Sequence, residues 1–315
     1  MATVLITGGT GLIGKHLTKM LVSKGYDVII LTRQPLTVNR CLPSVSYAKW
    51  DLANQIVGAD AITKADYIIH LAGASVAEKR WTVQRKQEII NSRTQSSALI
   101  VKALKEIPNA IKAVISTSAI GWYGADDTNS LQNGFKEDAK ADNEFLGKTC
   151  RLWEESIEPV KKLNKRLIKL RIGIVLSKDG GALKEFIKPL QMGVAAILGN
   201  GKQMISWIHI EDVCRLFIHA MENENMQGVF NAVAPNPVNN KILTLTLAKQ
   251  RNKFFIPFYV PAFVLKIMLG EMSIEVLKSA NVSAAKTQST GFNFNYTTIA
   301  EALRKEVSGE MRNEK

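Results

Sequence analysis

The chain has 315 residues, of which 46% are hydrophobic, so a substantial core in one large or two smaller domains is expected and extensive disorder is excluded. Its net charge of +13 is spread along the sequence without a zinc-finger spacing, an aromatic RNA-binding motif or an arginine-rich arm, so a phosphate-bearing small molecule is expected as ligand and nucleic acid is not. No apolar run reaches the roughly 20 residues that span a bilayer, no signal peptide or metal-ligand spacing is recognised, and three isolated cysteines fit a reducing compartment, so a cytoplasmic protein without a metal or a membrane partner is expected.

A glycine-rich turn close to the start of the chain is the most informative motif. An apolar run at residues 3–7 leads into glycines spaced G-x-x-G-x-x-G, and a segment with helical periodicity starts at Leu12. Gly8 permits a tight turn, Gly11 lets the backbone approach a pyrophosphate, and Gly14 lets the helix pack against the strand. The pattern favours a dinucleotide site over a plain strand-turn-helix with incidental glycines. The contacts expected from this turn are Gly8, Thr10, Gly11, Leu12 and Ile13.

The end of the next strand distinguishes between the two nicotinamide dinucleotides. The apolar run 28–31 ends at Thr32 and Arg33, where a fold that prefers NAD usually has an acid that binds the ribose 2′-hydroxyl. A guanidinium pairs with a 2′-phosphate, so NADP is preferred over NAD; the alternative is a surface arginine at a strand end. A short strand at 46–50 then leads to Asp51, which either accepts from the adenine amino group or caps the following turn.

Further candidate contacts come from the next strand and helix. The strand at 66–71 contains His70, which is expected to be a core residue, and ends in mostly small residues against which a cofactor can lie. The helix that follows runs to about residue 104 and carries Glu88 and Arg93 close together, either as cofactor contacts or as a mutual surface ion pair. These elements are expected to contribute Leu71, Ala72, Gly73, Glu88 and Arg93.

Strands and helices alternate through the first 175 residues, which predicts an α/β fold with a Rossmann-like, doubly wound parallel sheet. Ligands bind beyond the carboxyl ends of such strands, so Ser118, at the end of the buried strand 113–118, and Tyr123, just after it, are expected beside the nicotinamide. Tyr123 either donates a proton there or, with its neighbours, forms an aromatic wall or a packed turn. The rest of the predicted core comprises a helix at 144–157, a strand at 165–176, a return to the sheet at 207–210, a helix capped by Asp212 and a strand at 229–232.

Taken together, the motifs resemble those of the extended short-chain dehydrogenases/reductases, and in particular their epimerase-family branch. The similarity extends from residue 3 to about residue 303. Beyond the glycine turn, the matching segments are 71–74, 79–82, 91–93, 116–118, 151–154, 171–173, 207–213, 231–237 and 290–292.

The resemblance implies an NADP-binding Rossmann core with a smaller C-terminal substrate region. Residues 1–172 would form the core, with 208–236 returning to it, and residues 173–207 and 237–315 would form the substrate region. Carried over by position, the cofactor contacts would be the glycine turn, Thr32, Arg33, Leu71, Ala72, Glu88, Arg93 and Val175.

One departure from the resemblance concerns the catalytic helix. The superfamily carries a Tyr-x-x-x-Lys pair there, in which the phenol transfers the proton and the lysine lowers its pKa. The segment 144–157 contains no tyrosine and has Leu146 and Cys150 at the two positions. Ser118 matches the hydroxyl that orients a substrate oxygen. The candidates for the missing proton donor are Tyr123, Glu144 and Lys148.

Two functions are consistent with these features. The first is an NADP(H)-binding epimerase-family oxidoreductase that acts on a small molecule such as a nucleotide-sugar or a carbonyl compound. The second is an NADP(H)-binding regulatory or sensor protein that has lost the chemistry. A small-molecule substrate is the expected partner, and self-association as a homodimer is left open.

Overall fold

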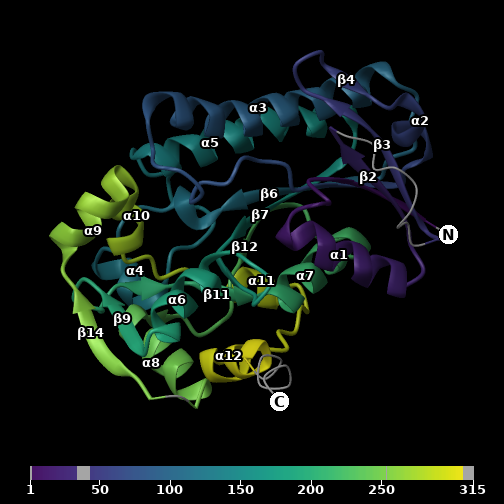
Figure 1. The fold of residues 1–315 in the computed structure, drawn as a ribbon. Coiled ribbons are helices and arrows are strands. Elements are labelled where there is room, and N and C mark those ends of the chain that lie inside the picture. The colour runs from purple at the N-terminus through teal and green to yellow at the C-terminus, as the bar shows by residue number, and fades with distance from the viewer. Residues whose placement is uncertain (1, 34–42, 253, 308–315) are drawn as a thin grey trace.

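The computed structural model describes residues 2–33, 43–252 and 254–307 (Figure 1). The segment that joins Arg33 to the strand expected at 46–50 falls largely outside these residues. Among the helices described, none combines the length and the apolar character needed to cross a membrane. In the same part of the chain, no three His, Cys, Asp or Glu side chains are grouped so that they could hold a metal ion.

A sheet of eight strands forms the centre of the described structure, in the order β12-β7-β6-β5-β1-β2-β3-β4. Its neighbouring strands run parallel except for β4, which is antiparallel to β3. The chain order reverses between β1 and β5, which is where ligands bind in a doubly wound sheet. The strands are β1 (Thr3–Thr7), β2 (Asp27–Thr32), β3 (Val45–Asp51), β4 (Ile56–Val57), β5 (Tyr67–His70), β6 (Ala113–Ala119), β7 (Arg166–Ile172) and β12 (Gly228–Ala232).

Helices cover both faces of this sheet, as Figure 1 shows. One face carries α1 (Leu12–Ser23) and α7 (Ile210–Glu222), and the other carries α2 (Ala59–Lys64), α3 (Val83–Glu106) and α5 (Phe145–Ile157). Alternate side chains of β1 enter the two cores, Val4 and Ile6 on the α1 side and Leu5 on the α3 side. Strands buried on both faces read as continuous apolar runs, which is why the sequence reveals them. The predicted Rossmann-like, doubly wound sheet is confirmed.

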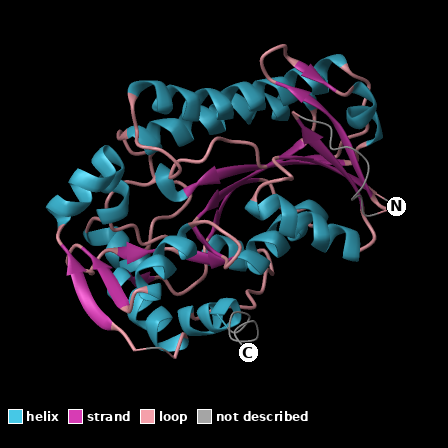
Figure 2. Cartoon of the chain, in the orientation of Figure 1, coloured by secondary structure: helices cyan, strands magenta, loops and turns pink. Residues whose placement is uncertain are grey.

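The second half of the chain adds smaller sheets and a separate core. Figure 2 shows them as short strands among helices at the lower left. The strand pairs are β8 (Ile174–Leu176) with β11 (Trp207–His209), β9 (Val194–Leu198) with β14 (Ile256–Val260), and β10 (Met204–Ile205) with β13 (Val238–Asn239). The helical segments are α4 (Thr128–Asn133), α6 (Ala182–Gln191), α8 (Asn240–Gln250), α9 (Ala262–Leu269), α10 (Ser273–Leu277), α11 (Ala285–Ser289), α12 (Ile299–Val307), η1 (Ile120–Trp122), η2 (Glu158–Leu163) and η3 (Gly270–Met272). Helices α6, α8 and α12 pack around Trp207 and Leu243.

The predicted return to the main sheet at 207–210 is wrong. Strand β11 pairs with β8, and the main sheet is rejoined only by β12 among the strands described. Gly173 separates β7 from β8, and a Cβ on Gly173 would lie 2.6 Å from the carbonyl oxygen of Ser206. The chain therefore crosses itself closely at this glycine, and β8 leaves the sheet that β7 belongs to.

The N-cap predicted for the following helix is also wrong. Helix α7 is capped by His209, whose Nδ1 accepts from the N–H of Glu211 at 3.2 Å. Asp212 is fully buried and instead accepts from the backbone N–H groups of Asn295 (3.0 Å) and Tyr296 (2.9 Å). Its carboxylate therefore fastens the C-terminal segment to the core.

Candidate functional site

The glycine turn brings β1, β5 and α1 into direct backbone contact. Gly8 has a φ of +69°, and a Cβ on it would lie 2.9 Å from the carbonyl carbon of Leu71. A Cβ on Gly14 would lie 2.5 Å from the carbonyl oxygen of Gly8. Only glycine fits both positions without displacing the backbone. The close helix–strand packing expected at Gly14 is confirmed.

The start of α1 offers free donors beside this turn. Gly11 donates its N–H to the oxygen of Gly8 at 3.0 Å and acts as the helix N-cap. Within the described chain, no side chain caps the first turn of α1. The amides of Leu12 and Ile13 therefore keep their donors for an anion, and the helix dipole adds to the attraction. A pyrophosphate fits this arrangement.

A buried hydroxyl–imidazole pair fixes the exit from β5. The Oγ1 of Thr7 accepts from the N–H groups of Leu71 (3.1 Å) and Ala72 (3.2 Å) and lies 2.7 Å from the Nδ1 of His70. Burial lowers the pKa of His70 to about 3, so the ring is neutral. Because the Thr7 oxygen already accepts these two bonds, its own proton is directed to Nδ1, and Nε2 faces the Ser96 hydroxyl at 3.3 Å. His70 is the core residue that the sequence predicted, whereas the role of Thr7 was missed.

The end of β2 carries the residue expected to select the cofactor. Arg33 directly follows β2 and is exposed. Thr32 stands opposite Lys49 in the parallel register with β3, so a second exposed cation lies at this edge, which the sequence analysis did not identify. Asp51 accepts from the backbone N–H (3.1 Å) and the side-chain amide (2.9 Å) of Asn54, and these bonds hold the pKa of its carboxyl below the usual range. The turn-capping role of Asp51 is thus present, and its contact with adenine stays a prediction.

Arg93 reaches from α3 to the segment that follows β5. One guanidinium nitrogen donates to the carbonyl oxygens of Ala74 and Ile89, both at 3.0 Å, and the group lies 4.9 Å from the ring centre of Trp153. A Cβ on Gly73 would lie 3.3 Å from the guanidinium carbon of Arg93. Arg93 therefore holds the exit of β5 in place. Its direct contact with a cofactor stays a prediction.

Glu88 pairs with a different arginine from the one expected. Its carboxylate accepts from Arg85 at 2.7 Å, and the Glu88 side chain is 57% exposed. Arg85 is buried and also donates to the carbonyl oxygen of Ser75, so it ties the start of α3 to the same segment that Arg93 holds. The predicted mutual ion pair of Glu88 with Arg93 is therefore replaced by a pair with Arg85.

The two residues proposed for catalysis belong to one buried polar network at the end of β6. Ser118 donates to the carboxylate of Glu154 at 2.8 Å, and the same carboxylate accepts from Arg171 at 2.8 Å and 3.2 Å. Arg171 also donates to the Tyr123 hydroxyl at 3.0 Å, which in turn donates to the Asn231 side chain at 2.6 Å. All five residues are at most 4% exposed.

This network argues against a proton-donor role for either hydroxyl. Burial raises the pKa of Tyr123 to about 12, and its oxygen already accepts one hydrogen bond and donates another. Ser118 donates its only proton to Glu154. Either group would have to break these bonds to reach a substrate, so the packed-turn alternative fits Tyr123 better. Their catalytic roles stay predictions.

Apolar groups face the end of β6 from helix α5. A Cβ on Gly121 would lie 3.1 Å from the Cβ of Leu146, and the Sγ of Cys150 lies 3.6 Å from the carbonyl oxygen of Ala119. Burial raises the pKa of the Cys150 thiol to about 11, so it is not a thiolate at neutral pH. The two positions that align with the Tyr-x-x-x-Lys pair thus point at this strand end and carry no proton-transfer group.

The segment after Val175 crosses the start of α1. Val175 belongs to β8 and is half-buried against the core between the sheet and helix α1. A Cβ on Gly181 would lie 3.3 Å from the side chain of Leu12, and His16 contacts the carboxylate of Asp179 at 2.9 Å. The glycine turn is therefore flanked by the segment that the resemblance assigns to the cofactor.

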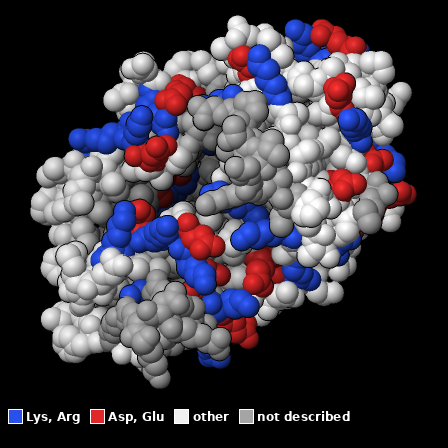
Figure 3. All heavy atoms as spheres, turned by 45° about the vertical axis from the view of Figure 1, so that its right-hand side comes forward, with Lys and Arg blue, Asp and Glu red and all other residues white. Residues whose placement is uncertain are grey.

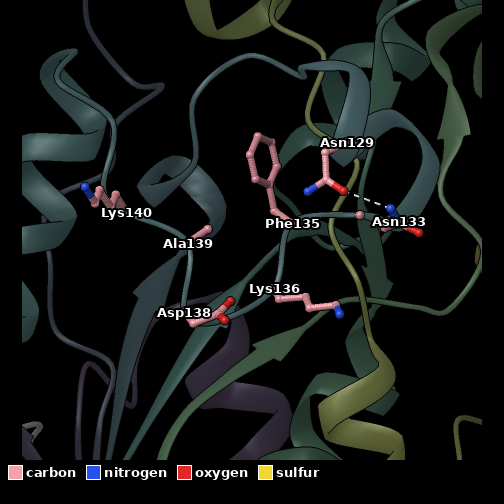
Figure 4. Close-up of a pocket in the computed structure, with 8 residues that line it drawn as sticks. Asn129, Asn133, Phe135, Lys136, Asp138, Ala139 and Lys140 are labelled. Atoms are coloured by element: carbon pink, nitrogen blue, oxygen red, sulfur yellow. Dashed lines mark hydrogen bonds between the residues drawn. The ribbon is translucent and has the colours of Figure 1, made fainter.

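A cavity of about 460 Å³ lies away from the glycine turn, in the loop between β6 and α5 (Figure 4). None of the predicted site residues lines it. The Phe135 ring stacks on Tyr123 with 5.1 Å between the ring centres, so the cavity adjoins the outer side of the buried network. The lining residues are Asn129, Asn133, Gly134, Phe135, Lys136, Asp138, Ala139 and Lys140.

Charged side chains of both signs surround a hollow on the face drawn in Figure 3. Blue and red groups alternate there, and no single basic stripe crosses this face.

A glycine turn at the switch point of a doubly wound sheet, beside an uncapped helix start, defines a dinucleotide-binding Rossmann protein. The family model described as "NAD dependent epimerase/dehydratase family" matches residues 4–232, and the model described as "Domain of unknown function (DUF1731)" matches residues 260–306. The chain belongs to the NAD dependent epimerase/dehydratase family, in the epimerase-family branch that its motifs resemble.

Relatives of known sequence and structure cover nearly the whole chain. Epimerase family protein YfhF of Bacillus subtilis is 33% identical over 95% of this chain and 96% of its own length. Epimerase family protein SSP1921 of Staphylococcus saprophyticus is 34% identical over 96% of this chain and 98% of its own. The crystal structure of human epimerase family protein SDR39U1 (isoform 2) with NADPH superposes with a TM-score of 0.84 at 27% identity, covering 97% of this chain and 99% of that one.

Proposed function

We propose that this protein binds NADP(H) across the switch point between β1 and β5. The observation that carries the proposal is the glycine turn, in which Gly8 leaves no room for a Cβ and the amides of Leu12 and Ile13 lack a side-chain cap. The pyrophosphate would bind these amides, and the 2′-phosphate would bind Arg33 with Lys49 at the end of β2. The NADPH in the structure of human SDR39U1 supports this choice of cofactor.

The nicotinamide half would lie toward the carboxyl end of β6. NADPH bound there supplies a hydride. We propose that this family member is an oxidoreductase for a small carbonyl compound or nucleotide-sugar, because residues 4–232 match the family model of NAD dependent epimerases and dehydratases. With Leu146 and Cys150 in place of a Tyr-Lys pair, the proton that accompanies the hydride would come from water or from one of the exposed candidates, Glu144 and Lys148.

A second candidate function follows from the same strand end. Burial of Ser118 and Tyr123, together with the apolar face of α5, leaves no described proton donor at the positions that the family's chemistry uses. An NADP(H)-binding sensor that no longer catalyses hydride transfer would have this arrangement.

NADPH oxidation measured across a panel of carbonyl compounds and nucleotide-sugars distinguishes the two. Turnover that survives in Tyr123→Phe and Ser118→Ala supports an oxidoreductase whose proton comes from neither hydroxyl. Tight NADPH binding without turnover on any member of the panel supports the sensor. Absence of NADPH binding contradicts both, since both rest on the cofactor site.

A further inference from the structure

The outer edge of the second half exposes an unusual number of large apolar side chains. They lie on β14 and just before it, on α9 and on the turn before β9, and Figure 1 shows β14 leading directly into α9 at the left margin. We refer to these side chains as the β14–α9 face. Their exposed fractions range from 55% to 82%. The members are Met192, Phe254, Ile256, Phe258, Phe263, Ile267 and Met268.

Strands β9 and β14, which pair beneath this face, do not present the polar side chains that a ribbon with one side in water normally has. In the parallel register, Val194 stands opposite Ile256, Ala196 opposite Phe258, and Leu198 opposite Val260. These side chains share one face of the ribbon, because paired residues in a parallel ladder point the same way. That face is apolar throughout, whereas a strand pair with one side in water normally carries polar residues there.

The face is too large for an isolated surface patch. Seven side chains of this kind, at the exposures found, leave about 900 Å² of apolar surface if each large side chain is given an area of roughly 190 Å², within the range typical of aromatic groups. The largest patch on a typical monomer is about 300–600 Å². A stable, specific interface buries about 800 Å² on each partner. The β14–α9 face of one chain is therefore large enough to form one side of such an interface.

The charge distribution favours a second copy of this chain as the occupant. Copies with a net charge of +13 repel one another, and they can approach best through a surface that carries little charge. Between residues 254 and 269 the only charged residue is Lys266. A helix that binds a lipid surface usually carries several basic residues on its polar face, whereas α9 carries this one.

We propose that the β14–α9 face is the interface of a homodimer in which the two copies pack face to face. Pairing through the free edge of β14 is disfavoured. The N–H of Ile256 points toward β9, where it donates to Gly193, so the next residue, Pro257, occupies an outward position and has no N–H to offer. Side-chain packing of the apolar ribbon and of α9 across a two-fold axis therefore forms the contact.

The interface adjoins the cofactor-side elements. Arg80 donates to the carbonyl oxygen of Ile267 at 3.2 Å, and Lys86 at the start of α3 bonds Glu271 at 2.8 Å. Dimerisation thus immobilises α9 from the outside while these two cations hold it from the inside.

Sedimentation equilibrium of the full chain tests the proposal. We expect a dimer at about 10 μM protein, and a dissociation constant that falls as salt is raised, because salt screens the repulsion between two cationic copies. Ile267→Glu and Phe258→Glu each place a carboxylate in the buried contact on both copies, and should raise the dissociation constant about 100-fold or more. Both side chains are at least half exposed in the single chain, so the fold should persist, and thermal melting by circular dichroism checks this.

Leu131→Glu is the matched control, because Leu131 is 56% exposed on α4, outside the face, and its replacement should leave the dimer intact. A wild-type chain that stays monomeric at about 100 μM overturns the proposal, as does a dimer that both substitutions leave unchanged. Flotation with phosphatidylglycerol vesicles is run in parallel. A monomer that floats through Ile267 and Phe258 identifies lipid as the occupant and likewise overturns the homodimer.

Discussion

Replacing Arg33 with alanine should weaken NADPH binding and leave NADH binding nearly unchanged. Arg33 stands exposed at the end of β2, where the register with β3 also brings Lys49. A hydrogen bond to a charged partner contributes about 1.5–3 kcal/mol, which corresponds to roughly a 10- to 100-fold change in affinity. Because Lys49 shares the position and water screens both cations, the loss should lie nearer the lower figure. Arg33→Ala with Lys49→Ala together should give the larger loss.

Titration of NADPH and NADH by nicotinamide fluorescence measures both affinities on the same preparation. Arg151→Ala is the matched control, since Arg151 is an exposed arginine on α5, far along the chain from β2. The NADPH affinity of the wild type should fall with added salt more steeply than its NADH affinity. An equal loss for the two dinucleotides in Arg33→Ala would refute the assignment of Arg33 to the 2′-phosphate.

Three positions in or beside the core allow tests of stability. Gly8→Ala places a Cβ within 2.9 Å of the Leu71 carbonyl carbon at a positive φ, so it should lower the free energy of unfolding by about 1–3 kcal/mol. It should also abolish the stabilisation by NADPH. A variant that melts with NADPH at the same temperature as the wild type with NADPH would contradict this. Glu154→Gln leaves the Arg171 guanidinium buried without its counter-charge and should cost about 3–5 kcal/mol in urea unfolding, whereas Glu155→Gln at the exposed neighbouring position should cost little. The pKa of His70 is lowered to about 3 in the folded chain, so between pH 6.5 and pH 3 the unfolded chain binds a proton that the folded chain does not. The free energy of unfolding should therefore fall as the pH is lowered from 6.5 toward 3. His70→Gln should flatten that pH dependence, and parallel wild-type and variant curves would rule the histidine out as its source.

The sequence predicts the fold well where one local pattern determines each element. Apolar runs such as 28–31 and 113–118 can be buried on both faces only in a covered parallel sheet, and the glycine turn specifies where the first helix begins. Prediction from the sequence fails where a strand pairs with a partner that local patterns do not specify. The apolar run at β11 is equally suited to the main sheet or to β8, and the decisive event is the close crossing of Gly173 by the chain at Ser206.

In the candidate site, too, the sequence predicts the local contacts and not the partners that lie far along the chain. Contacts that the backbone itself makes, at Gly8 and Gly14, follow from residue type and spacing. The side-chain partners do not, because Tyr123 meets Arg171 and Asn231 from strands that are 48 and 108 residues further along the chain. Thr7 was missed because a threonine at a strand end carries no signal by itself, and its role depends on a histidine 63 residues away.

The fastening of the C-terminal segment by Asp212 has a consequence for the order in which the protein can fold during synthesis. Phe292 lies in the same core as Val4 and Ile6 on β1, although nearly the whole chain separates them. Until the ribosome has added that phenylalanine, the α1 and α7 side of the sheet stays open to water, and its apolar side chains are available to chaperones or to other nascent chains. At ordinary elongation rates the first strand therefore waits roughly 15 to 60 seconds for the residue that closes its core.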